Sequence, residues 1–305
     1  MAGVYHRLPP ARTGPRVGAM LRALLVAAAA FGLALPAAGQ EGARGKPQRV
    51  VSLNQCADQL VLMLADPANV ASVTWLSLDP SASAVAEQAA QVPAVNHGFA
   101  EEILPLEPDL VVAGAYTTPF TVQTLRRVGF NVEVLGVPSN LDEIREQIRL
   151  VGELLWERER ARAAIAELDA AIAAAAPQPE AKPTKAVILQ PGGFTAGPGS
   201  FEHDLLTAAG FTNVAADAGI EGYGFLSLEV LLLANPALIV VPVDDPARPS
   251  IAEAMLRHPA MRASGRRAQV VHLPAALWNC AGPANAGAVA RLAAARQGEQ
   301  EPAAR

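Results

Sequence analysis

Short apolar runs alternate with amphipathic stretches along most of the chain, and this alternation predicts its elements. Runs rich in Val, Ile and Leu are typical of buried parallel strands, and the stretches between them repeat apolar residues at helical spacing. The expected strands are 49–53, 70–74, 92–95, 109–113, 131–135, 185–190, 237–241 and 269–273. The expected helices include 58–64, 121–128, 202–209, 228–234, 251–257 and 281–296. Strands alternating with helices indicate an α/β fold with mostly parallel sheets.

A long helical pattern divides this alternation between Pro138 and Pro177. Residues 139–143 read as a helix start, with acids in the first turn, and apolar residues then recur at helical spacing up to Ile172. The pattern predicts one helix of about 35 residues, or two nearly continuous ones. We therefore predict two α/β lobes joined by one long rigid helix. The expected segments are an N-terminal lobe at 46–138, the connecting helix at 139–177, a C-terminal lobe at 178–297 and a flexible tail at 298–305.

The N-terminal segment has the pattern of a secretory signal peptide. Arg22 precedes the apolar run 23–35, and the small residues 36–39 follow it. The apolar run is too short to span a membrane. We therefore expect residues 1–39 to be a signal peptide that is removed near Gly39.

The residues around this segment refine that expectation. Pro9, Pro10 and Pro15 are unusual before an apolar signal core, and they favour Met20 as the true start of translation. The first cysteine of the chain, Cys56, is far from the expected cleavage site, so a lipid anchor is not expected. The predicted product is a soluble, exported protein.

Composition excludes several classes of protein. With 51% hydrophobic residues the chain is not intrinsically disordered, and a net charge of -5 argues against a general nucleic-acid binder. Two cysteines are too few for a disulfide-rich miniature scaffold or a four-cysteine zinc site. No metal site of the protein's own is predicted.

One segment occurs twice. Residues 101–112 align without a gap on residues 229–240. In both copies a Glu starts a short helix, a Pro ends it and a buried strand follows. The repeat indicates two related lobes, with chance similarity of two helix–Pro–strand units as the alternative.

Several segments together carry a family resemblance. They are Val50–Leu53 with the helix after it, Leu106–Val111, the helix between Pro138 and Ala176, Val187–Leu189 with the Gly-rich stretch to Ser200, and Ser227–Glu229. In order and spacing, over residues 48–296, they resemble the substrate-binding proteins of ABC importers, the periplasmic family that carries cobalamin, ferric siderophores or haem.

The resemblance implies a function. A protein of this kind works as a monomer in the periplasm, binds a cobalamin-like or iron-chelate ligand in a cleft between its lobes and delivers it to an ABC importer permease with its ATPase. It is not an enzyme and needs no cofactor, although the bound ligand can itself contain cobalt or iron. The family docks on its permease through one surface Glu per lobe, and Glu101 and Glu229 match those positions. Favourable interaction with a helix dipole is the alternative role for both.

The aromatic residues, only 5% of the chain, fall mostly in loops after predicted strands rather than inside them. Aromatics normally concentrate in cores, so this placement indicates a cleft for a large, flat, partly apolar ligand. Anchoring of each loop to its own lobe is the alternative. Trp75, Tyr223 and Trp278 are the leading candidates. The full predicted set is Cys56, Trp75, His97, Phe99, Tyr116, Phe194, Tyr223, Phe225, Trp278 and Cys280.

The two cysteines follow strands in opposite lobes and have three interpretations. They form a disulfide that ties the lobes together, they contact ligand or metal as thiols, or they are inert and buried. The thiol interpretation leaves an alternative function open, that of an exported thiol-dependent enzyme or redox protein. His97 is either an axial ligand to haem iron or cobalt or, as we prefer, a hydrogen-bonding loop histidine.

The Gly-rich stretch 192–200 resembles a phosphate-binding loop only superficially. It lacks the Gly-Lys-Ser/Thr ending of such a loop, and Ser200 is best interpreted as a helix cap. Ser200, His203 and Asp204 on one helical turn do not converge as a hydrolase triad does.

Overall fold

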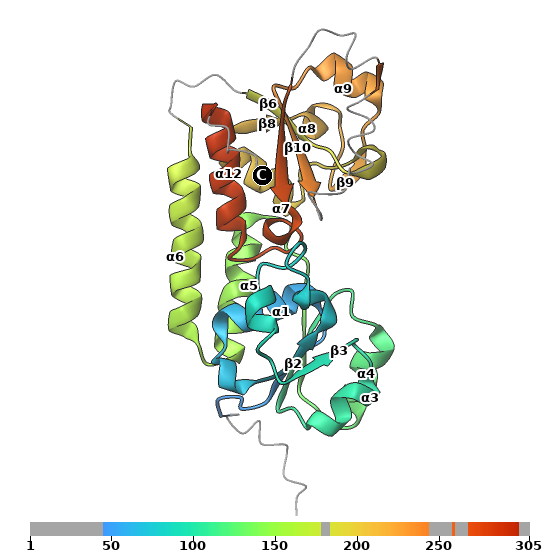
Figure 1. The fold of residues 1–305 in the computed structure, drawn as a ribbon, viewed down its shortest axis with the longest axis vertical. Helices are drawn as coiled ribbons and strands as arrows, with labels where there is room; N and C mark the ends of the chain where they lie inside the picture. The colour runs from blue at the N-terminus through green and yellow to red at the C-terminus, as the bar shows by residue number, and fades with distance from the viewer. Residues whose placement is uncertain (1–44, 178–183, 244–257, 260–267, 299–305) are drawn as a thin grey trace, which may run out of the picture. The chain divides into compact units, whose positions relative to one another are not determined.

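The computed structural model describes residues 45–177, 184–243, 258–259 and 268–298 (Figure 1). Within these ranges the chain forms two parallel sheets, a small antiparallel pair and helices packed around them. The predicted signal peptide, the predicted helix at 251–257 and residues 299–305 of the predicted tail lie outside the described residues. No helix in the described part is long and apolar enough to cross a membrane.

The N-terminal lobe, described without a gap over 45–138, is built on a five-stranded sheet in the order β3-β2-β1-β4-β5. Every neighbouring pair is parallel. The strands are β1 (Val50–Ser52), β2 (Val70–Thr74), β3 (Ala94–Asn96), β4 (Leu110–Gly114) and β5 (Val132–Leu135). The helices are α1 (Gln55–Leu64), α2 (Ala86–Ala89), α3 (Ala100–Ile103) and α4 (Pro119–Arg127).

Buried residues on both faces of this sheet explain the apolar runs of its strands. Val50 packs with Leu60 and Leu64 of α1, whereas its neighbour Val51 packs on the opposite face with Ile103 and Leu125, from α3 and α4. Successive side chains of a strand point to opposite faces, so a strand covered on both sides is apolar throughout.

The C-terminal lobe has a four-stranded parallel sheet in the order β11-β10-β6-β8 within its described residues. Its strands are β6 (Thr184–Ile188), β8 (Phe211–Asn213), β10 (Leu238–Val243) and β11 (Gln269–Pro274). A separate antiparallel pair joins β7 (Phe194–Ala196) to β9 (Tyr223–Phe225). The helices are α7 (Phe201–Ala208), α8 (Val214–Asp217), α9 (Leu228–Ala234) and α12 (Asn285–Gln297). The predicted α/β class with mostly parallel sheets is confirmed.

The repeated sequence segment is also a structural repeat. Glu107 and Asn235, at matching positions, both have a left-handed backbone, with φ of 44° and 50°. The strands that follow, β4 and β10, each lie beside the first strand of their lobe. After that first strand, Leu53 donates its N–H to Val112 in one lobe, and Leu189 donates to Val240 in the other. The two lobes therefore share one plan.

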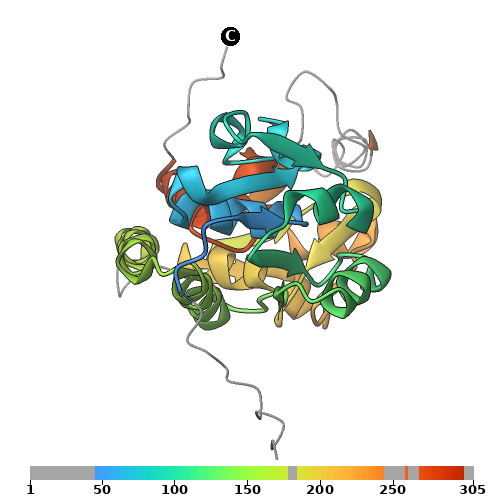
Figure 2. The ribbon, with the colours of Figure 1, turned by 90° about the horizontal axis from the view of Figure 1, so that it is seen from below.

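The connecting segment is not one long helix; it is nearer to the alternative of two helices, although these do not continue in one line. It forms two helices, α5 (Leu141–Leu154) and α6 (Arg158–Ala175), which lie side by side (Figure 2). They run antiparallel, because Arg145 near the start of α5 bonds to Asp169 in the second half of α6, at 2.8 Å. The chain reverses at Trp156, whose φ of 61° is left-handed. A left-handed residue stops a helix, and helical periodicity continues on both sides of it, so the pattern did not reveal the turn.

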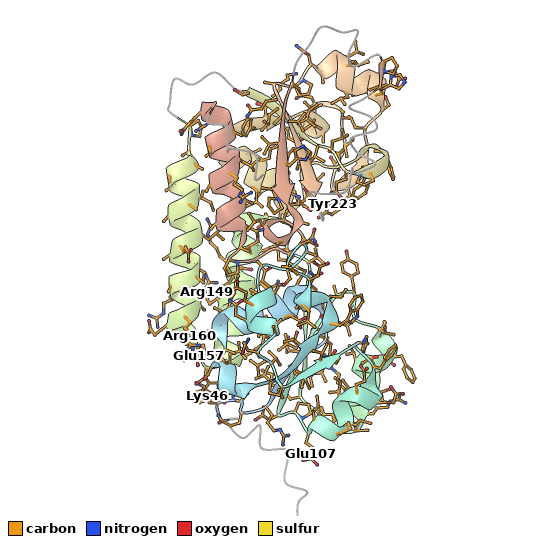
Figure 3. All side chains as sticks on the ribbon, in the orientation of Figure 1. Lys46, Glu107, Arg149, Glu157, Arg160 and Tyr223 are labelled. Atoms are coloured by element: carbon orange, nitrogen blue, oxygen red, sulfur yellow. A yellow bond between two sulfur atoms is a disulfide. The ribbon has the colours of Figure 1, made fainter. Side chains whose placement is uncertain are left out.

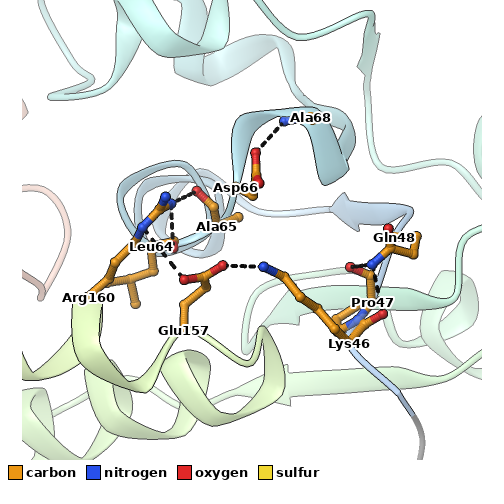
Figure 4. Close-up of polar contacts among 9 residues, drawn as sticks. All are labelled: Lys46, Pro47, Gln48, Leu64, Ala65, Asp66, Ala68, Glu157 and Arg160. Atoms are coloured by element: carbon orange, nitrogen blue, oxygen red, sulfur yellow. Dashed lines mark hydrogen bonds and ion pairs between the residues drawn. The ribbon is translucent and has the colours of Figure 1, made fainter.

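Both ends of this helical hairpin are fixed. At the turn, Glu157 accepts from Lys46 at 2.6 Å, and Arg160 donates to the carbonyl oxygens of Leu64 and Ala65 at the end of α1 (Figure 4). At the other end, Arg296 of α12 donates to the Ala175 carbonyl at 3.0 Å. The hairpin thus makes contacts with both lobes.

Candidate functional site

Cys56 and Cys280 form a disulfide bond with a Cα–Cα distance of 5.1 Å. Cys56 is the second residue of α1 in the N-terminal lobe, and Cys280 precedes α12 in the C-terminal lobe. Of the three interpretations of the cysteines, the structure has the first, a covalent tie between the lobes. Because this bond uses both cysteines of the chain, neither sulfur is a free thiol that could bind ligand or metal.

The loop that carries Cys280 is held tightly in place. The Asn285 side chain donates to the carbonyls of Leu277 and Cys280 and accepts from the Gly282 N–H, at 2.7–3.0 Å. A Cβ added at Gly282 would lie 3.0 Å from Nε2 of Gln59, so the backbone of this loop lies directly against α1. The disulfide is therefore part of a wider contact between the lobes.

Trp278 is not available to a ligand in this structure, which corrects its prediction as a cleft residue. Its side chain is 2% exposed and belongs to the core, with its ring 6.5 Å from that of Phe201 in α7. The loop fixed by Asn285 turns the indole inward. For Trp278 the alternative of anchoring a loop to its own lobe therefore holds.

Three predicted aromatics of the N-terminal lobe follow strands at one edge of the same sheet, in which β1 separates β2 from β4. Trp75 follows β2, Phe99 follows β3 and Tyr116 follows β4. Because the strands are parallel, their carboxyl ends share one edge, the usual place for a ligand in an α/β fold. All three side chains are more than half exposed, Tyr116 most at 84%. All three therefore lie exposed at the edge of the sheet where a ligand would be expected.

His97 lies in this group but is already paired. Its Nδ1 lies 2.9 Å from Glu102 Oε1, and its backbone N–H donates to Glu102 Oε2 at 2.7 Å. Its ring is 6.2 Å from that of Trp75. The arrangement is that of a hydrogen-bonding loop histidine, the role that we preferred from the sequence.

A buried carboxylate that the sequence did not reveal holds Trp75 in place. Asp58 of α1 accepts hydrogen bonds from Thr74 and Ser77, which flank Trp75, at 2.5–3.0 Å. Burial raises the pKa of Asp58 to about 6, against the opposing effect of these hydrogen bonds. In the sequence Asp58 reads as an ordinary acid in the first turn of a helix, so no signal distinguished it.

The C-terminal lobe carries a second group of aromatics, which we call the aromatic ribbon: Phe194 on β7 with Tyr223 and Phe225 on β9. Phe194 pairs with Phe225 and Ala196 with Tyr223 across the two strands. The rings of Phe194 and Tyr223 are nearly parallel, with centroids 5.8 Å apart, and Phe225 meets Phe194 edge-on at 5.5 Å. The ribbon exposes much of its aromatic surface, with Phe225 73% exposed.

Tyr223 connects the ribbon to the interior and to the other lobe. Its hydroxyl donates to Glu202 of α7 at 2.9 Å. Its pKa is raised by burial, then by the Glu202 carboxylate, and also by a charge interaction with Tyr116 of the N-terminal lobe. Figure 3 shows Tyr223 on the side of its lobe that faces the N-terminal lobe. Tyr223 is thus the residue of the ribbon for which an influence from the other lobe is seen.

Glu101 and Glu229 occupy equivalent places in the two lobes. Each is the second residue of its helix, α3 or α9, and each side chain is exposed. Hydrogen bonds from its own backbone N–H and from Ser227 lower the pKa of Glu229, so it is ionised at neutral pH. Each lobe thus presents a carboxylate at a matching position.

Side chains that could bind a metal ion are the next feature of the described part of the chain. Among the described residues, no group of three or more His, Cys, Asp or Glu side chains is arranged to hold a metal ion. What the arrangement offers a ligand is aromatic surface from two lobes.

Comparison with known proteins identifies the family. The family model described as periplasmic binding protein matches residues 50–277. The chain belongs to the periplasmic binding protein family. This periplasmic binding protein is 32% identical to a cobalamin-binding protein of Halobacterium salinarum over 203 residues. The aligned stretch covers 65% of this chain and 54% of that protein. A vitamin B12-binding protein of Salmonella typhimurium is also 32% identical, over 146 residues and 54% of its length. The chain thus spans about half the length of the curated relatives that it matches.

Solved structures show the same fold. A periplasmic heme-binding protein, RhuT, from Roseiflexus sp. RS-1 in apo form matches with a TM-score of 0.69 and 26% identity, over 83% of this chain and 99% of that one. A periplasmic heme-binding protein from Pseudomonas aeruginosa matches with a TM-score of 0.64 and 26% identity, over 85% and 95% of the two chains. The periplasmic vitamin B12-binding protein BtuF of Vibrio cholerae, with a TM-score of 0.63 over 84% of this chain and 98% of that one, is 22% identical and supports the fold alone.

Proposed function

We propose that this periplasmic binding protein captures a cobalamin-like or metal-chelate ligand and delivers it to an ABC importer. Membership of the family supports a binding protein, and the names of the relatives favour a tetrapyrrole or corrin ligand. The observation that carries the proposal is the exposure of aromatic rings on both lobes, with Tyr223 on the side of its lobe that faces the N-terminal lobe (Figure 3). Stacked rings bind flat, partly apolar molecules well.

The proposed contact residues come from both lobes. They are Trp75, His97, Phe99 and Tyr116 from the first, and Phe194, Tyr223 and Phe225 from the second. The protein itself needs no cofactor in this proposal, because any cobalt or iron arrives with the ligand. The thiol-dependent alternative lacks a free thiol, since the cysteines on which it rests are bonded to each other.

The ligand is tested by titrating the purified protein with cyanocobalamin, haemin and a ferric siderophore. Saturable changes in visible absorption, together with a raised melting temperature, are expected for at least one of them. Replacement of Trp75 by Ala should weaken binding of that ligand about tenfold or more, since a stacked ring contributes on the order of 1–3 kcal/mol. If none of the three ligands binds, the proposed ligand class is wrong.

We also propose that Glu101 and Glu229 dock the protein on basic sites of the importer permease in the inner membrane, from the periplasmic side. Their exposure and equivalent positions support this role. The Glu101→Lys/Glu229→Lys variant should bind ligand normally in solution and fail to support its uptake by cells that contain the importer.

The matched control reverses the same number of charges at exposed sites of the hairpin, Glu146→Lys/Glu167→Lys. This control should support normal uptake. Equal loss of uptake in both variants would show a general charge effect, and normal uptake in the first would refute docking through these residues.

A further inference from the structure

Tyr223 lies in a backbone that does little to fix its side chain. Gly222 precedes it with a φ of 61°, and Gly224 follows it. Glycine adds conformational freedom, and β9 is only three residues long, with a single strand beside it. The direction of the Tyr223 ring therefore depends on contacts that the side chain itself makes.

One of these contacts is the hydrogen bond to Glu202. Glu202 is the second residue of α7 and is 6% exposed, between Phe201 and the core residue Leu205 on a well-packed helix. Hydrogen bonds to an ionised acceptor are about twice as strong as neutral ones. Glu202 thus holds the end of the ring from a rigid part of the lobe, and the ring stays nearly parallel to Phe194.

This hydrogen bond also determines which part of the Tyr223 side chain is exposed. The hydroxyl points to a buried carboxylate, while 45% of the residue remains exposed. A ring held in this way presents its face or edge, and its oxygen is already in use.

We infer that Glu202 is a positioning residue of the ligand site: it directs the Tyr223 hydroxyl inward, so that Tyr223 meets the ligand with its ring and not as a hydrogen-bond donor or a metal ligand. The inference rests on the proposed function. It assigns a role to a buried carboxylate that does not itself touch the ligand.

A double-mutant cycle tests this with haemin and cyanocobalamin as probes. One of the two probes is expected to bind to the wild type. Glu202→Ala and Tyr223→Phe should each weaken the binding of that probe by about tenfold, which is the effect of one hydrogen bond to a charged group. The double variant should bind no more weakly than either single variant, because both remove the same contact. Glu202→Gln keeps an acceptor oxygen and should regain most of the lost affinity. Glu221→Ala removes an exposed charge from the same loop and serves as the control.

Two results would overturn the inference. In the first, the double variant loses as much binding free energy as Glu202→Ala and Tyr223→Phe lose together. In the other, Tyr223→Phe changes the visible spectrum of bound haemin while Glu202→Ala leaves it unchanged, which would make the phenol oxygen a ligand of the iron.

A measurement without ligand separates this inference from the proposed function. The near-ultraviolet circular dichroism of Tyr223, obtained as the difference between wild type and Tyr223→Leu, should be lost in Glu202→Ala and kept in Glu202→Gln. If the Tyr223 signal persists in Glu202→Ala, the positioning role is refuted, even if neither probe binds. If neither probe binds but the Tyr223 signal changes as expected, only the proposed ligand class is refuted.

Discussion

Removing the disulfide should destabilise the protein strongly. In the Cys56→Ser/Cys280→Ser variant the unfolded chain loses a cross-link between positions 224 residues apart. Closing a loop of that length removes conformational entropy from the unfolded chain, which corresponds to ~5 kcal/mol of stabilisation at 25 °C. This is a large part of the 5–15 kcal/mol that folded proteins typically have in total. Other lobe contacts, such as Gly282 against Gln59, remain in the folded variant.

Urea unfolding followed by far-ultraviolet circular dichroism measures this loss. Three samples are needed, namely oxidised wild type, reduced wild type and the double serine variant. Reduced wild type controls for the substitutions, and it should unfold at nearly the same urea concentration as the variant. Oxidised wild type should also show a smaller dependence on urea, because its cross-linked unfolded chain exposes less surface. A difference below about 1 kcal/mol between the oxidised and reduced proteins would refute the reasoning, since the loop-closure effect should be several times larger.

Two further substitutions test the interior. Burial raises the pKa of Asp58 to about 6 from the 3.8 of an exposed carboxyl, so the folded protein holds this proton more tightly than the unfolded chain does, and stability should fall as the pH rises through 6. Urea unfolding at pH 5 and at pH 7 measures the loss of unfolding free energy between the two pH values, and this loss should be about 1 kcal/mol smaller in Asp58→Asn than in wild type. An equal loss in wild type and variant would contradict the raised pKa of Asp58. Gly152→Ala should lose about 1–2 kcal/mol in the same assay, because its Cβ would come within 2.3 Å of the Ala161 Cβ and push α5 from α6. Gly136→Ala, where nothing lies within 4 Å, is its control, and equal stability of the two variants would refute close packing of the hairpin.

The sequence predicted the parallel core well because each buried strand is marked by its own composition. Val70–Thr74 was predicted to the residue, and the strands at β1, β4, β5, β10 and β11 to within a few residues. The strands β7, β8 and β9 escaped prediction because, unlike the three-residue strand β1 in the apolar run 49–53, none of them lies in a longer apolar run, and Gly224 lies at the centre of β9. So short a run, with a glycine, has no strand signature.

The site was harder to predict, because burial and pairing depend on contacts between distant segments. Trp75, Phe99, Tyr116, Tyr223 and Phe225 were predicted because they follow strands or lie in loops, and all five are exposed in the structure. Trp278 satisfied the same criterion and yet lies in the core, since the bonds of Asn285 turn its loop inward. The partners of Asp58 and Glu202 are far from them in sequence, and no local pattern marks either carboxylate. Whether the two cysteines meet depends likewise on how the lobes pack, which the sequence left open.

The disulfide has a consequence for biosynthesis. A protein with four cysteines can be oxidised in three ways, and one with six in fifteen, so such proteins depend on reshuffling of wrong bonds. This chain has two cysteines, and every intramolecular oxidation therefore gives the native bond. Oxidative folding of the chain should need an oxidant but no isomerase. The wrong bond that remains open to it is a disulfide between two molecules.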